Sequence, residues 1–178
     1  MASIVIPKLQ IYNEDNTNVQ DTWNVGTLDL ASADNHESNV LVINVWNNRG
    51  GNSDVPDLVG CKIATRSVNG DLINCQVVTG QWVQACVDST ASIDPSTGQK
   101  IFSAIGADSL GREIACDVAH QGASGDDKTN CIIKGTANNG EPTVATDNYS
   151  KISLKVKPPI NAEAKVHYFK TRISGYYI

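Results

Sequence analysis

The stretch that decides the fold is Lys151-Ile152-Ser153-Leu154-Lys155-Val156-Lys157, close to the C-terminus. Its isoleucine, leucine and valine alternate with lysine and serine, so an extended strand would have one apolar face and one polar face. Such alternation is typical of an antiparallel sheet that packs one face on a core and exposes the other to water. Two prolines follow directly, and they must end the strand because proline has no N–H to donate to a ladder.

The same two-residue period recurs along the whole chain, and turn-forming Asn, Asp and Gly residues separate the periodic segments. No window has the periodicity of an amphipathic helix of three turns. The strands predicted in this way cover residues 3–12, 23–30, 39–46, 59–66, 72–78, 81–87, 100–105, 112–118, 130–134, 151–157 and 165–173. We expect the last two of these segments to form a terminal antiparallel pair, joined by the short connection that follows the prolines.

Many short strands with Asn/Gly turns favour an all-β fold, and we predict an antiparallel β-sandwich. The chain has 178 residues, no internal repeat and no long linker, so we expect a single domain spanning 1–178. One segment leaves the strand order open. Residues 72–141 are expected either to elaborate the sandwich as a β-rich insertion or to form a small second sheet.

The composition excludes several classes of protein. With 40% hydrophobic and 19% charged residues, the chain is that of a soluble globular protein. No apolar run is long enough for a membrane-spanning helix. Fourteen Lys and Arg against 19 Asp and Glu give a net charge of -5, which provides no source for phosphate neutralisation, so nucleic acid is not an expected partner. The N-terminus lacks a basic region followed by an apolar one, so we expect synthesis in a host cytoplasm without a signal peptide.

The five cysteines show neither a C-x-x-C pair nor a histidine at zinc-finger spacing. Two of them, Cys61 and Cys116, fall on apolar positions of alternating segments. We therefore expect reduced thiols packed as small hydrophobic side chains, with disulfides and metal binding as the less favoured alternatives.

No catalytic constellation is visible in the sequence. None of the three histidines, His36, His120 and His167, stands in a catalytic context, and no serine lies in a G-x-S-x-G elbow. Residues 13–18 and 47–54 supply oxygen atoms of the kind that calcium prefers, but neither follows the twelve-residue calcium loop. Turn formation explains these residues without a metal. We therefore expect a non-enzymatic protein with no cofactor, no catalytic residue and no metal.

The aromatic residues are the candidates for a binding surface. Trp23 and Trp46 occupy strand positions that predict core packing. Trp82 is less clearly a core residue, and it joins Tyr176 and Tyr177 as a candidate binding or interface residue. If these three rings form a stacking surface, the protein is a carbohydrate-binding module or a host-surface adhesin domain. The C-terminal tyrosines are expected either to contact a neighbouring subunit or to cap their own core.

Two segments resemble immunoglobulin-like sandwiches of bacterial and phage surface proteins. The first is Val40-Leu41-Val42-Ile43-Asn44-Val45-Trp46-Asn47-Asn48-Arg49-Gly50-Gly51, continued by a second strand over residues 55–63. The second, residues 156–169, is similar to the closing hairpin V-x-V-P-x-x-A-x-x-G-x-x-x-F of such domains, although Ala164 and Lys165 stand near the expected glycine. The resemblance implies an immunoglobulin-like sandwich. It implies little about function, because this fold carries many functions.

A second resemblance concerns function. The segments Lys8-Leu9-Gln10-Ile11-Tyr12-Asn13, Trp23-Asn24-Val25-Gly26-Thr27-Leu28-Asp29, Trp46-Asn47-Asn48-Arg49-Gly50-Gly51 and Thr79-Gly80-Gln81-Trp82-Val83, with the Tyr-rich C-terminus, resemble small structural proteins of tailed phages. This resemblance implies a virion component. We expect a capsid decoration protein that binds the major capsid protein and its own copies, with a tail or baseplate location as the less favoured alternative.

Overall fold

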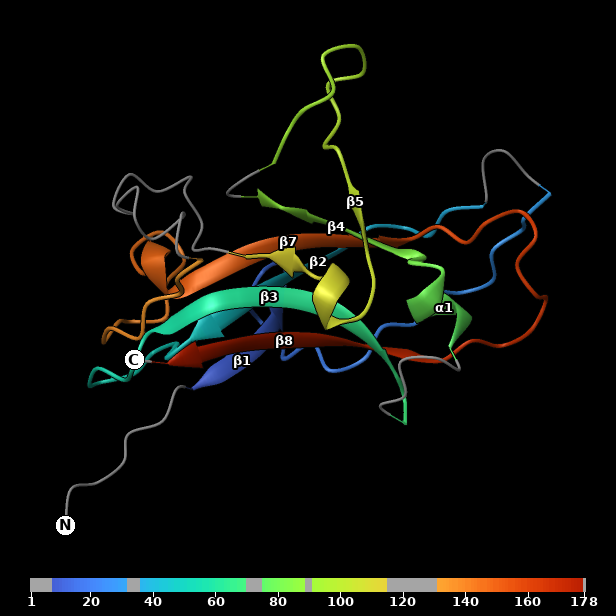
Figure 1. The fold of residues 1–178 in the computed structure, drawn as a ribbon. Helices are drawn as coiled ribbons and strands as arrows, with labels where there is room; N and C mark the ends of the chain where they lie inside the picture. The colour runs from blue at the N-terminus through green and yellow to red at the C-terminus, as the bar shows by residue number, and fades with distance from the viewer. Residues whose placement is uncertain (1–7, 32–35, 70–74, 89–90, 115–130, 178) are drawn as a thin grey trace.

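The protein is an antiparallel β-sandwich, as the sequence predicts (Figure 1). The computed structural model describes residues 8–31, 36–69, 75–88, 91–114 and 131–177. A five-stranded sheet has the order β1-β2-β7-β4-β5, and a three-stranded sheet has the order β6-β3-β8. The strand bounds are β1 Leu9–Asn13, β2 Leu41–Asn47, β3 Leu58–Ser67, β4 Val83–Val87, β5 Ser103–Ile105, β6 Arg112–Glu113, β7 Tyr149–Val156 and β8 Phe169–Tyr177.

Strand β7, which contains the alternating stretch, lies at the centre of the larger sheet. Ile152 is paired with Ile43 of β2 on one side and with Val87 of β4 on the other. All three side chains are buried and face the smaller sheet. The alternation of the sequence therefore places the core on one side of β7, and each such side chain contributes about 1.5–3 kcal/mol by leaving water.

Strand β3 supplies the opposite side of the core and is the central strand of the smaller sheet. Ile63 is fully buried and is paired with Ile173 of β8. A β-bulge between Val59 and Lys62 interrupts this pairing, and Gly60 within it has φ +61. The bulge increases the local twist of β3 without breaking the ladder with β8.

Three predicted strands have a different structure. Of the predicted strand 72–78, residues 76–78 lie in the one-turn helix α1 (Gln76–Thr79), and residues 72–74 lie outside the described residues. Residues 23–30 form no strand, and the described residues 131–134 contribute only an isolated bridge between Ile133 and Leu58. The apolar side chains of these segments pack on the core. A strand also needs a neighbouring strand whose backbone N–H and C=O groups are not already paired. Two single-turn 3-10 helices, η2 (Asp108–Leu110) and η3 (Thr146–Asn148), complete the described helices.

The prediction of a terminal antiparallel pair is wrong. β7 and β8 lie in different sheets, and the connection between them crosses from the larger sheet to the smaller one. The physical reason is that both ladders of β7 are occupied, by β2 and by β4, so that the next strand must pair elsewhere. Residues 72–141 supply β4 and β5 to one sheet and β6 to the other, so the described part of this segment is integral to the sandwich.

The two tryptophans predicted for the core both pack on apolar residues, but in different places. Trp46 is fully buried, but it lies on the outer side of the larger sheet, where it stacks on Tyr149 with ring centroids 4.6 Å apart. Trp23 is half-buried and meets Phe169 edge to face. Within the described residues, no helix has the length and apolar character needed to cross a membrane.

Candidate functional site

The two C-terminal tyrosines lie at the end of β8, where the backbone is fixed and the rings are exposed. Tyr176 is paired with Val59 and Tyr177 with Leu58, so the C-terminal strand belongs to the sheet of its own domain. The rings nevertheless keep 60% and 54% of their surface in solvent. The ring of Tyr176 passes over Gly60, where an added Cβ would lie 2.8 Å from it. Both candidate residues are therefore held on a rigid strand and remain accessible.

Trp82 lies away from these tyrosines and is not available to a ligand. Its side chain is only 5% exposed, belongs to the main core, and meets the ring of His167 edge to face at 4.7 Å. Its backbone closes the turn after α1, since its N–H donates to Val77 and its carbonyl accepts from Lys157. A buried indole cannot stack on a sugar ring, so the structure assigns Trp82 to packing.

The sandwich is open along the side where the edge strands β1 and β8 meet, and we call this side the β1–β8 opening. A cavity of about 460 Å³ lies at one end, lined by Leu9, Leu58, Ile173 and Tyr177 among others. A second cavity of about 440 Å³ lies at the other end, where Trp23 and Phe169 line it together with side chains of the larger sheet. The opening thus exposes inner-face side chains that a sandwich with longer edge strands would cover.

The outer side of the smaller sheet is cationic, although the chain as a whole is acidic. We call it the cationic face. Arg66 and Arg172 both pair with Asp108, the latter at 3.0 Å, and Lys62 lies 3.8 Å from Glu113. Lys170, paired with Arg66 in the ladder, is exposed on the same side. Among the described residues, these four cations and two carboxylates give this side a net positive charge, which suits an acidic partner surface.

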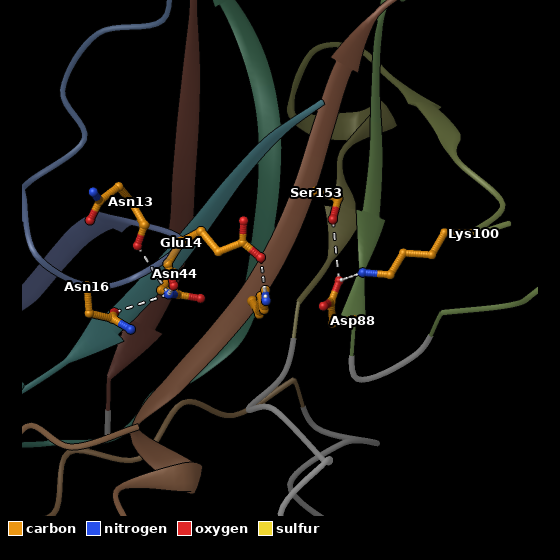
Figure 2. A network of polar contacts seen from close by, with 8 residues as sticks. Asn13, Glu14, Asn16, Asn44, Asp88, Lys100 and Ser153 are labelled. Carbon is orange, nitrogen blue, oxygen red and sulfur yellow. Dashed lines mark hydrogen bonds and ion pairs between the residues drawn. The ribbon is translucent and has the colours of Figure 1, made fainter. Parts of the chain in front are cut away.

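The outer side of the larger sheet is polar too, but its groups are occupied by contacts within the chain (Figure 2). Asn44 of β2 donates through Nδ2 to the carbonyl oxygens of Asn13 and Glu14, at 3.2 and 2.9 Å, and to Oδ1 of Asn16 at 3.1 Å. Glu14 also reaches Lys151 of β7 at 3.0 Å. These contacts fasten the 13–18 turn over the sheet.

The contacts of Asn44 explain why oxygen atoms of the 13–18 turn converge. Three oxygen atoms converge on one point, as calcium ligands do, but the amide of Asn44 occupies that point and supplies the donors itself. Within the described residues, no three His, Cys, Asp or Glu side chains are grouped so that they could hold a metal ion. The turn is thus explained by hydrogen bonding between amides and carbonyls.

Further along the same sheet surface, Asp88 and Glu37 anchor lysines. Asp88 Oδ1 accepts from Lys100 Nζ at 2.7 Å and from Ser153 Oγ at 3.5 Å (Figure 2). Glu37 accepts from Lys155 and is also paired with Lys157, and these bonds lower the pKa of Glu37 to about 2. The lysines of the alternating stretch are therefore fixed by carboxylates of the same chain.

Ser153 and the described cysteines lie in surroundings that do not activate them as nucleophiles. Ser153 contacts a carboxylate at a distance longer than a strong O–H···O⁻ bond and has no histidine among its hydrogen-bond partners. The described cysteines, Cys61, Cys75, Cys86 and Cys131, are free and buried, as expected for them; Cys116 lies outside the described residues. Burial, with a smaller contribution from the neighbouring Cys131, raises the pKa of Cys61 to about 12. The thiol is thus protonated at neutral pH.

A buried asparagine cluster, which sequence patterns do not predict, lies at the end of the sandwich near η3. Asn148 Nδ2 donates to the carbonyl oxygens of Asn47, Lys134 and Thr136 at 3.3, 3.0 and 2.9 Å. Asn48 Nδ2 donates to the carbonyl oxygens of Ser53 and Gly135 at 2.8 and 2.9 Å, and Asn47 Nδ2 to that of Pro56 at 3.0 Å. The side-chain amides thus donate hydrogen bonds to loop carbonyl oxygens that have no neighbouring strand to bond with.

His36 and His167 are placed in structural surroundings, and His120 lies outside the described residues. His36 is 3.7 Å from Glu37, and His167 lies against Trp82 with Nε2 3.0 Å from the carbonyl of Glu163.

Comparison with family models, with curated proteins and with solved structures gave no significant match to the chain. The architecture and the surfaces described above are therefore the basis for a functional proposal.

Proposed function

We propose that the chain is a non-enzymatic structural protein of a tailed-phage virion, which binds the outside of the assembled capsid through the smaller sheet. The observation that carries the proposal is the exposed ring of Tyr176, held on a paired strand on the same side of the sheet as the cationic face; the exposed Tyr177 follows it and projects to the other side. Aromatic side chains on a rigid backbone lose little conformational entropy on binding, and tyrosine is enriched at protein interfaces.

The difference between the two sheets supports a binding role for the smaller one. The outer side of the larger sheet is covered by the 13–18 turn and by salt bridges to the lysines of β7. The outer side of the smaller sheet keeps Lys170, Arg172 and Tyr176 exposed. A surface with exposed aromatic rings and cations, next to one already occupied by its own loops, is the natural place for a protein partner.

The resemblance of the chain to small structural proteins of tailed phages supports the virion setting. A protein that binds the assembled shell and not its free subunits stabilises the particle by mass action. Contacts of this kind require a rigid, folded surface and no chemistry, which suits the buried thiols and the amide-fastened loops. Tail or baseplate attachment would use the same surface on a smaller number of sites.

The alternative of a carbohydrate-binding module is weakened because Trp82, the largest ring of its predicted stacking surface, is buried. Tyr176 and Tyr177 alone do not face each other across a groove, since they are consecutive residues of a strand and project to opposite sides. Glycan binding therefore enters the test below as a contrary outcome.

The proposal is tested by separating a lysate of the producing cells on a density gradient and measuring the chain by mass spectrometry in each fraction. We expect it to migrate with DNA-filled heads at a copy number close to that of the coat protein. A few copies per particle would indicate the tail or baseplate. Absence from particles, or binding of polysaccharide by the isolated chain, would refute the proposal.

A variant series then tests the surface. Purified chain is added to assembled shells that lack it, and bound protein is measured after sedimentation. Tyr176→Ala should reduce binding about tenfold or more, as truncation of a central interface tyrosine does. Tyr168→Ala is the matched control, because Tyr168 is also exposed but precedes β8 and lies outside the cationic face. Equal loss with both variants would contradict the assigned surface.

A further inference from the structure

The free edge of β8 carries the next inference, which concerns how two copies of the chain join. Strand β8 pairs with β3 along one edge, and no backbone hydrogen bond between described residues uses its other edge. β8 has nine residues and is therefore long for an edge strand. Sheet edges of this length are usually covered or paired, because they present rows of unused donors and acceptors.

The ladder determines which groups point outward. On β3, Thr65 donates to Gly106, and Leu58 exchanges hydrogen bonds with Ile133, so the backbone groups of Thr65 and Leu58 point away from β8. In an antiparallel pair, directly opposed residues either bond to each other or both point away. Thr171, opposite Thr65, and Tyr177, opposite Leu58, therefore direct their N–H and C=O groups to the free edge.

The alternation along β8 extends this assignment to the whole strand. The residues whose backbone groups point outward are Phe169, Thr171, Ile173, Gly175 and Tyr177. The residues between them bond to β3, which agrees with their register opposite Arg66, Ala64, Lys62 and Val59. The extra residue of the bulge lies on β3, so the alternation of β8 itself is unbroken.

We propose that β8 pairs with β8 of a second copy, antiparallel about a two-fold axis at Ile173. In this register every outward-pointing residue meets an outward-pointing residue, as a ladder requires. Phe169 is then opposite Tyr177 of the second copy, and Thr171 is opposite Gly175. About ten backbone hydrogen bonds form, two for each of the five outward pairs. The two smaller sheets become one continuous sheet of six strands.

The charges on β8 select this register. Lys170 is set opposite Tyr176 of the second copy, which permits a cation–π contact, and Arg172 is set opposite Ser174. If the two-fold axis moved one residue toward the N-terminus, Arg172 would lie opposite Arg172 of the second copy. If it moved one residue further, Arg172 would lie opposite Lys170 of the second copy. A slip the other way would leave Phe169 without a partner. The basic residues of β8 therefore oppose the registers shifted toward the N-terminus, and the loss of a partner for Phe169 disfavours the register shifted the other way.

This inference deepens the proposed function, because it identifies where copies on a particle would contact one another, but its test uses purified chain alone. Sedimentation equilibrium over a series of concentrations should show a monomer–dimer equilibrium. Thr171→Pro removes an outward N–H and leaves the ladder with β3 intact, since proline is tolerated where the N–H of an edge strand faces outward. Two-fold symmetry doubles the loss, so dimerisation should weaken roughly thirtyfold.

Thr171→Val is the matched control, because it keeps the N–H, the β-branched shape and the position of the side chain. It should dimerise as the wild type does. A wild type that stays monomeric, or a Thr171→Pro variant that dimerises normally, would overturn the inference. A dimer in solution together with absence from virions would refute the proposed function and leave this inference standing.

A second measurement covers the case in which Thr171→Pro does not fold. Amide hydrogen exchange of the wild type is followed by NMR at low and high concentration. The amides of Thr171 and Ile173 should gain protection as concentration rises, whereas those of Lys170 and Arg172, already bonded to β3, should not change. Equal protection of both sets, or none, would exclude pairing through this edge.

Discussion

Replacement of Asn148 tests whether the buried asparagine cluster holds the loops at its end of the sandwich. The side chain is 3% exposed, and its amide donates to three backbone carbonyls, while its Oδ1 accepts from the hydroxyl of Thr136 at 3.1 Å. Asn148→Ala leaves these groups without a partner in a place that water reaches poorly. Each buried polar group left unpaired costs about 1–3 kcal/mol, and partial relaxation of the loops recovers some of the loss.

We therefore expect Asn148→Ala to lower the free energy of unfolding by about 3–4 kcal/mol, allowing for one bond at 3.3 Å being weak. For a chain of this length, that loss corresponds to a fall in Tm of roughly 6–16 °C. Asn148→Asp should cost at least as much, because a carboxylate would face the same carbonyl oxygens without a donor. Urea titration and calorimetry both measure the effect.

The control is Asn139→Ala. Asn139 lies in the same connection, is exposed, and accepts one local hydrogen bond from the N–H of Glu141 at 3.0 Å. Its removal should cost less than about 1 kcal/mol. If Asn148→Ala also falls below that value, the amide is dispensable and the loops are held by packing. The reasoning about the cluster would then be wrong.

Three further predictions concern other parts of the molecule. The lowered pKa of Glu37 means that the carboxylate stabilises the fold above its unfolded pKa and that this contribution is lost as the pH falls toward about 2, so Glu37→Gln should lower Tm at pH 7 and make no difference near pH 2. The raised pKa of Cys61 predicts slow alkylation by iodoacetamide at pH 8 in the native protein and fast alkylation in urea, measured by mass spectrometry of the peptide. Ile152→Ala in the centre of β7 should cost about 3–5 kcal/mol in urea titration, and Lys151→Ala, on the exposed side of the same strand, about 1 kcal/mol or less.

The strands with strict alternation were predictable because the pattern and the tertiary structure require the same thing. In β2, β3 and β7 the apolar positions face the opposite sheet, and a sheet neighbour lies on each side. Local periodicity and long-range pairing then agree, and the boundaries follow to within a few residues.

Residues 23–30 show why alternation alone is insufficient. Trp23, Val25 and Leu28 all pack against the core, although a two-residue period would place Leu28 on the opposite face from the other two. The segment has no ladder partner among the described residues and is not a strand. Hydrophobic periodicity reports which side chains are buried. Hydrogen bonding depends on which edges are free, and that depends on the order of all the other strands.

The candidate site was predictable only in part, for a related reason. The exposure of Tyr176 and Tyr177 agrees with their position at the end of the chain. Trp82 was misjudged because it stands just before β4, at a point where the two-residue period has not begun. The asparagine cluster could not be predicted, because its hydrogen bonds join Asn47 and Asn48 to partners that lie between 86 and 101 positions away in the sequence. Turn composition and buried amide hubs use the same residue type.

The two sheets differ in how far contacts within the chain already occupy their outer sides. The outer side of the larger sheet carries the 13–18 turn and the ion pairs of its own lysines, so a partner there would have to displace bonds such as those of Asn44. The smaller sheet has a free edge, exposed tyrosines and cations that are shared between few carboxylates. A partner at that sheet adds hydrogen bonds to groups that water now satisfies, and it disturbs nothing within the fold. These differences are the reason that we propose the smaller sheet for association, whether the partner is a second copy or a shell.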